Sequence, residues 1–196
     1  MKKISKMKKL NINTIITLVL FVTLFVIEST AQRFNGLDEA PHDISYYRTS
    51  MVSAPMVKVI YGRPQKNEEE VFGNMVAYNE IWRTGANEAT EVKFYQDIVF
   101  GEVKVNAGTY VLYTIPGENE WEIILSSNLD VLGSFQYNSK FDVARIKVSP
   151  KRAEELEVFS IIFKEKSENI QMVLGWDTTR VNIPITLSKK EEYARL

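Results

Sequence analysis

Cysteine is absent from this chain of 196 residues, and His42 is its only histidine. Without cysteine the fold contains no disulfide, so its stability must come from a hydrophobic core. The two counts also remove the thiolate and imidazole sets that bind zinc, copper and haem, and we expect neither a metal site nor a cofactor. A Ser-His-Asp site would have to use His42, which we predict to lie in a solvated loop within residues 39–43.

The apolar run near the N-terminus is short. It extends over the thirteen residues from Ile15 to Ile27, whereas a helix that spans a bilayer needs about 20. Five lysines precede the run, and Ser29-Thr30-Ala31 follows it. This order is typical of a secretory signal peptide. We expect residues 1–31 to be that signal, cleaved after Ala31, and the protein to be exported to the periplasm, the outer-membrane surface or the extracellular space. The alternative is a retained membrane anchor.

Basic residues are outnumbered in the rest of the chain. Residues 32–196 contain 19 basic and 24 acidic residues, a net charge near −5. Such a surface repels phosphate backbones, and no basic stripe offsets it, so we expect no nucleic-acid partner. Membrane contact is expected only through an uncleaved signal. The remaining 165 residues suffice for one domain with one core.

Alternation of apolar and polar residues predicts an all-β domain over residues 56–188. Residues 32–55 are polar and interrupted, which favours a lead-in that wraps or frays, and residues 189–196 form a charged tail. We predict about nine short strands in an antiparallel β-sandwich of the jelly-roll type. The expected strands are 56–61, 91–95, 98–105, 109–115, 120–125, 142–148, 157–164, 170–176 and 180–187.

The middle of this domain has the strongest local signals. Residues 102–115 read as a hairpin through Asn106-Ala107-Gly108, with Tyr110 and Leu112 on one face and Val111 and Tyr113 on the other. Pro116-Gly117 predicts a type II turn into 120–125, so these three strands should form a meander.

Two stretches do not alternate, residues 71–82 and 129–141. We expect irregular loops or short helical turns there. Because binding sites concentrate in such loops, a site is expected there too.

Several segments carry a resemblance to a known family. They read VKVIYGRP at 57–64, VFG at 71–73, IWRTGANEAT at 81–90, AGTY at 107–110, IPG at 115–117 and WD at 176–177. Over about residues 56–185 the chain resembles the domain-of-unknown-function family twenty-nine-eleven, and the string WRTGANE is specific. The resemblance implies an exported protein of a Bacteroidetes-type bacterium and brings no assigned activity.

The string from Trp82 to Thr90 combines residue types that bind polar ligands. An indole stacks on sugars, rings or cations, and a guanidinium fork matches carboxylates or planar polar groups. We predict a site for a glycan or small polar ligand, formed by Arg63, Trp82, Arg83, Asn87 and Glu88. The alternative is structural: Arg83 pairs with Glu88 to fix the loop, and Trp82 closes one end of the sandwich.

A non-catalytic binding module is therefore the leading functional hypothesis, and two alternatives stay open. A carboxylate-dependent hydrolase is one, since Glu120 and Glu122 share one face of a strand, although a solvated strand face explains them equally well. A structural or assembly subunit is the other, and an exposed aromatic patch around Tyr110, Tyr113 and Trp121 would favour it. Residues 177–179 read as a hairpin turn rather than a calcium loop.

Overall fold

The computed structural model describes residues 11–25, 35–166 and 169–188. The chain divides into two units, Met1–Leu37 and Asp38–Leu196. The first contains the apolar helix α1 (Ile12–Phe25). Among the described residues, no helix has the length and apolar character needed to cross a membrane. The expected cleavage after Ala31 and the charged tail 189–196 lie outside the described residues.

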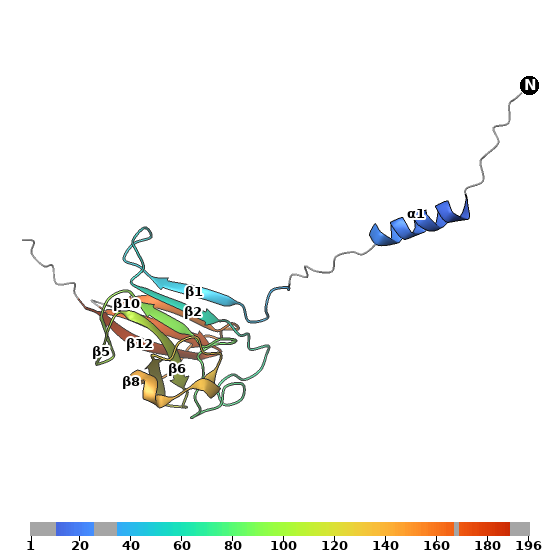
Figure 1. The fold of residues 1–196 in the computed structure, drawn as a ribbon. Helices are drawn as coiled ribbons and strands as arrows, with labels where there is room; N and C mark the ends of the chain where they lie inside the picture. Colours follow the sequence, from blue (N-terminus) through green and yellow to red (C-terminus); the bar gives the residue numbers. More distant parts are fainter. Residues whose placement is uncertain (1–10, 26–34, 167–168, 189–196) are drawn as a thin grey trace, which may run out of the picture. The chain divides into compact units, whose positions relative to one another are not determined.

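The second unit is a β-sandwich of two six-stranded antiparallel sheets (Figure 1), as the sequence predicts. The first sheet has the order β1-β2-β3-β6-β7-β8, with bounds His42–Tyr47, Val57–Gly62, Glu91–Phe94, Gly108–Ile115, Trp121–Ser126 and Asp142–Val148. The second has the order β10-β11-β12-β4-β5, with bounds Ser160–Lys166, Asn169–Trp176, Thr179–Leu187, Ile98–Phe100 and Val103–Val105. Strand β9 (Lys151–Arg152) pairs with β12.

Alternate residues of both sheets fill the space between them. On β6, Leu112 and Tyr110 belong to this main core. Val111 and Tyr113 point to the outer face of the first sheet, where they form a second cluster with Ile124 and with residues of the irregular loops. The predicted alternation along this strand is therefore confirmed, and the first sheet is apolar on both faces near its centre.

The strand count and one pairing differ from the prediction. The lead-in contributes an extra strand, because β1 pairs with β2 along its whole length. The expected hairpin at 102–115 is wrong: β5 pairs with β4, while β6 pairs with β3 and β7. The chain thus passes from one sheet to the other between β5 and β6. Periodicity marks strands and their faces but does not say which sheet a strand joins, so the predicted meander holds only for β6 and β7.

Two glycines stand at turns for different physical reasons. Gly101 adopts φ 62° and closes the tight turn between β4 and β5. Gly117 is not among the residues with positive φ, so the predicted type II turn is wrong. Glycine is needed at 117 because a Cβ there would overlap the carbonyl oxygen of Glu120.

The two irregular stretches take the form expected of them. Residues 71–82 consist of turns and isolated bridges. Residues 129–141 contain two short 3-10 helices, Ser134–Gln136 and Ser139–Phe141. Val131 of the second stretch packs on the outer apolar cluster of the first sheet.

Candidate functional site

Trp82 is half-buried and lies among core aromatics. Its backbone N donates to Thr114 O at 2.7 Å, and Thr114 N donates back to Trp82 O at 3.0 Å. Its ring lies 5.2–6.4 Å from four other aromatic rings, those of Phe72, Trp121, Phe159 and Trp176. The indole therefore belongs to the packing between the sheets.

The residues after Trp82 form a loop fixed by internal hydrogen bonds. Thr84 and Thr90 are fully buried, and Thr90 Oγ1 donates to Thr84 O at 2.7 Å. Thr84 has a positive φ of 59°. The loop approaches β2 so closely that a Cβ on Gly62 would overlap the carbonyl oxygen of Ala86. This density accounts for the small and hydroxyl residues of the string.

Three of the five predicted residues hold the segment that leads into β1. Asn87 Nδ2 donates to Asp38 Oδ1 and to Ala40 O, both at 3.1 Å. Glu88 Oε2 lies 3.1 Å from Nε2 of His42, and Arg63 Nη1 donates to Asp43 Oδ2 at 3.0 Å. We call these contacts the N-terminal clamp; it is made by Arg63, Asn87 and Glu88 on residues 38–43.

Arg63 also ties the two sheets together. Its Nε donates to Phe159 O at 3.1 Å, and its Nη2 donates to Ser160 Oγ at 2.9 Å. The guanidinium thus joins the edge strand β1 of the first sheet to the start of β10 in the second. All of its nitrogens have protein partners, so it has little capacity left for a ligand.

Arg83 stands apart from the clamp. Its Nε is buried and has no hydrogen-bond partner among the described residues, and Glu88 pairs with His42. The alternative pairing of Arg83 with Glu88 is therefore wrong. His42 opens strand β1 with a part-exposed side chain, which corrects its assignment to a loop. The five predicted residues thus do not converge on one opening.

The two strand carboxylates are both engaged in ion pairs. Glu120 Oε1 lies 2.7 Å from Lys147 Nζ, and Glu122 pairs with Arg145 across β7 and β8. Arg145 Nη2 also donates to Tyr137 at 2.6 Å. The pairs Glu120–Lys147 and Glu122–Arg145 are ordinary ion pairs between neighbouring strands on a solvated face. The aromatic patch proposed for an assembly surface is absent, since Tyr110, Tyr113 and Trp121 are all at most 9% exposed.

A different opening lies at one end of the sandwich, where turns from both sheets meet. This end pocket has a volume of about 370 Å³. It is lined by residues between 70 and 78, by the turns β6–β7, β8–β9 and β11–β12, by β9, and by the first residues of β7 and β12. The lining residues are Glu70, Phe72, Tyr78, Gly117, Glu118, Trp121, Pro150, Lys151, Arg152, Asp177, Thr178 and Thr179.

The floor of the end pocket is aromatic and its rim is charged. Phe72 and Trp121 are 7% and 2% exposed, whereas Tyr78 is half-buried. Burial, and then the charges of Glu118 and Glu70, raise the pKa of Tyr78 above its ordinary value. The phenol therefore keeps its proton at neutral pH and can act as a hydrogen-bond donor and acceptor.

The charges at the rim are balanced. Asp177 faces Lys66, whose Nζ lies 2.9 Å away and also contacts Glu155 Oε1 at 2.5 Å. Hydrogen bonds to Glu155 and Asp177 raise the pKa of Lys66, so the ammonium stays charged and neutralises Asp177.

Four further charged residues of the rim form no ion pair within the described part of the chain: two acids, Glu70 and Glu118, and two bases, Lys151 and Arg152. The end pocket thus favours neither an anion nor a cation by net charge.

Local sequence signals predict several of the segments that line the end pocket, but they do not predict that these segments meet at one end of the sandwich. The sequence predicts a site in the irregular stretch 71–82 and turns at 116–117 and 177–179. Each is a local signal. That these turns meet at one end depends on the pairing of strands far apart in the chain, which no local pattern specifies.

The fold and the end pocket define a β-sandwich protein with loops gathered at one end. Residues 45–185 match the family described as "Protein of unknown function (DUF2911)", and the chain belongs to this family. No curated protein and no solved structure matches the chain.

Proposed function

We propose that this protein is an exported, non-catalytic binding protein that takes a neutral, polyhydroxylated ligand such as a glycan in the end pocket. The observation that carries the proposal is the combination of an aromatic floor with a charge-balanced polar rim in one opening. The exposed lining is mostly polar, and polar groups beside an aromatic surface can fix the orientation of a small ligand.

The chemistry of the rim suits a sugar in particular. The C–H groups of a sugar pack against the faces of aromatic rings, and three rings line the end pocket, of which Tyr78 is the most exposed. Hydroxyl groups both donate and accept, so they can pair with carboxylates and with cations at the same time. Glu118 and Arg152 provide one group of each kind in the same opening.

A binding role fits the end pocket better than hydrolysis does. A carboxylate-dependent hydrolase needs one carboxyl group kept protonated by an apolar or buried site. Both unpaired carboxylates of the end pocket, Glu70 and Glu118, are exposed to solvent. Neither lies in an apolar or buried site of that kind, which supports a ligand-holding role for them.

Calorimetric titration with a panel of neutral, amino and acidic oligosaccharides tests this function. We expect a neutral sugar to bind, and Glu118→Gln and Arg152→Gln each to weaken it about tenfold by removing one charge-assisted hydrogen bond. Lys140→Gln, at an exposed position outside the end pocket, is the matched control and should bind as the wild type does. No binding by any sugar, or equal losses in all three variants, would refute the proposal. Accumulation of reducing ends would show hydrolysis instead.

A further inference from the structure

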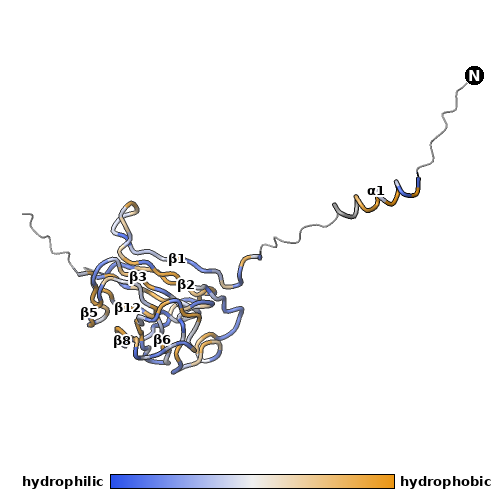
Figure 2. The backbone as a smooth tube through the Cα atoms, viewed as in Figure 1, coloured by the Kyte–Doolittle hydropathy of each residue, from blue (hydrophilic) through white to orange (hydrophobic). Residues whose placement is uncertain are grey.

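The turn between β1 and β2 presents two apolar side chains to solvent. Met51 is 98% exposed and Val52 is 96% exposed. Figure 2 shows this connection as a hydrophobic tip that projects from the sandwich. The turn is ordered by Ser53, whose Oγ accepts from Ser50 N at 3.2 Å and donates to Ser50 O at 3.0 Å, while Arg48 donates to its carbonyl. The apolar pair is thus held on a structured turn.

Basic and aromatic side chains surround the base of this tip. Tyr46, Lys58 and Lys93 are register neighbours on β1, β2 and β3. The guanidinium of Arg48 lies 4.9 Å from the ring centre of Tyr46, and Lys93 Nζ lies 4.8 Å from that of Tyr95. Both tyrosines are 43% exposed. These five residues form what we call the basic collar.

The basic collar stands against the net charge of the domain, although two acids lie at the same end: Glu165, which accepts from Tyr47 Oη at 3.1 Å, and Asp97, two residues after Tyr95. Residues 32–196 carry a net charge near −5, yet no aspartate or glutamate occurs between residues 44 and 62. On β3 the first acid is Glu91, two residues farther from the tip than Lys93. Ion pairing within the protein does not explain the collar, because Arg48, Lys58 and Lys93 form no ion pair among the described residues.

We propose that this end of the sandwich docks on an anionic lipid surface. Met51 and Val52 would enter the acyl boundary, Tyr46 and Tyr95 would lie at the level of the headgroups, and the three basic residues of the collar would face lipid phosphates. An apolar insertion flanked by aromatic and basic residues is the general arrangement of peripheral membrane binding. A protein partner is disfavoured, because two apolar side chains fall far short of the roughly 800 Å² per partner of a stable interface.

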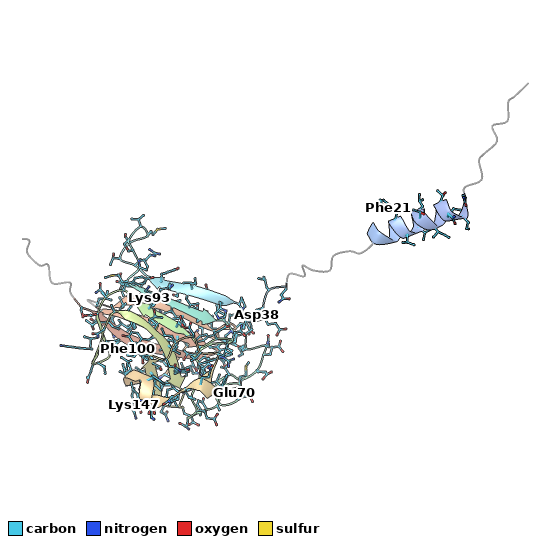
Figure 3. All side chains as sticks on the ribbon, in the orientation of Figure 1. Phe21, Asp38, Glu70, Lys93, Phe100 and Lys147 are labelled. Carbon is cyan, nitrogen blue, oxygen red and sulfur yellow. The ribbon has the colours of Figure 1, made fainter. Side chains whose placement is uncertain are left out.

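This docking leaves the end pocket free. Strand β2 runs from Val57 beside the tip to Gly62 beside the N-terminal clamp, and β6 runs parallel to it toward the β6–β7 turn of the end pocket. Figure 3 shows Lys93 of the collar and Glu70 of the pocket on opposite sides of the sandwich. A domain seated by its tip would therefore present the end pocket to the solvent.

The absence of cysteine makes the test direct, since one engineered cysteine can carry an environment-sensitive dye. We would label Met51→Cys in the full chain and, as a control at the other end, the exposed position Ser149→Cys. Both proteins retain the N-terminal segment, so adsorption through that segment is common to both. With vesicles containing phosphatidylserine, the dye at 51 should shift to the blue and brighten several-fold, and the dye at 149 should not.

Charge variants separate specific docking from general adsorption. Each basic residue near a lipid surface contributes roughly a fivefold gain in partitioning, so Lys58→Gln with Lys93→Gln should weaken the response at 51 about 25-fold. Lys151→Gln with Arg152→Gln removes the same charge at the end pocket and should leave the response unchanged. Added salt should weaken the wild-type response, because it screens exposed charges.

Three results would overturn the proposal. The dye at 51 could stay silent while the protein sediments with the vesicles, which would place binding elsewhere in the chain. The dyes at 51 and 149 could respond equally, which would indicate adsorption without orientation. The dye at 51 could respond to rising protein concentration without lipid, which would make a second copy of the chain the occupant.

Discussion

The substitution Gly62→Ala tests how closely the loop of residues 82–88 (WRTGANE) packs against the end of β2. A Cβ at position 62 would overlap the carbonyl oxygen of Ala86 and lie 2.8 Å from its carbonyl carbon and 3.1 Å from its nitrogen. Three backbone atoms of one residue thus oppose the methyl group. A flexible side chain could turn away, but a peptide unit must move as a whole.

The loop has little freedom to make that movement. Carbon atoms pack at about 3.5–4.0 Å, so the Ala86 peptide would have to shift by roughly 1 Å. Hydrogen bonds on both sides oppose the shift: Trp82 pairs with Thr114, and Thr90 N donates to Arg83 O at 3.1 Å. Overpacking of this kind costs about 3 kcal/mol. Alanine recovers about 0.5–1 kcal/mol by restricting the unfolded chain, which leaves a net loss of about 2 kcal/mol.

Denaturant unfolding followed by tryptophan fluorescence measures this loss. A change of about 2 kcal/mol corresponds to a Tm lower by roughly 4–8 °C for a chain of this size. Gly36→Ala is the matched control, since a Cβ there has no neighbour within 4 Å, and its stability should equal that of the wild type. If Gly62→Ala unfolds within about 0.5 kcal/mol of Gly36→Ala, the close approach of loop and strand is wrong.

Three further expectations concern the core, the pH response and the N-terminus. Trp82→Ala should lower the free energy of unfolding by about 3–5 kcal/mol because its ring packs on four others. Arg83→Ala, which removes no ion pair to any described residue, should cost less than about 1 kcal/mol in the same urea melts. Burial, and then the hydrogen bond to Asp142, raise the pKa of Tyr137 to about 12, above the usual 10. The contribution of Tyr137 to stability is therefore complete below pH 10 and is lost as the pH rises toward 12. Tyr137→Phe should therefore flatten part of the fall in stability over that range, and an unchanged profile would contradict the assignment. N-terminal sequencing of exported protein should begin at or near Gln32, and material that starts at Met1 would refute cleavage.

Local patterns were enough to predict the fold class and the faces of the strands. Alternation placed Leu112 in the main core and Tyr113 on the outer face, because side chains alternate across any strand whatever its partners. Sheet membership was different. Val105 and Gly108 are three residues apart and belong to different sheets, and only pairing with β4 and β3 determines this.

The candidate site shows the same limit of local reasoning. Asn87 and Glu88 were expected to bind a ligand, since their chemistry suits one, but their partners are Asp38 and His42 of the same chain. The chemistry of a side chain determines which groups it can bind, whereas the fold determines which groups lie within its reach. The end pocket was missed for the same reason.

The N-terminal clamp has a mechanical consequence. Strand β1 is an edge strand that starts at His42, so a pull on the preceding chain would load the hydrogen bonds of the β1–β2 ladder one at a time, starting from the pair His42 and Gly62. Such peeling requires little force, because each step breaks only one contact. The clamp lies at the point where the load enters, and Arg63 passes that load to β10 in the other sheet. A pull from the N-terminal side is thereby resisted at the strand that would otherwise separate first.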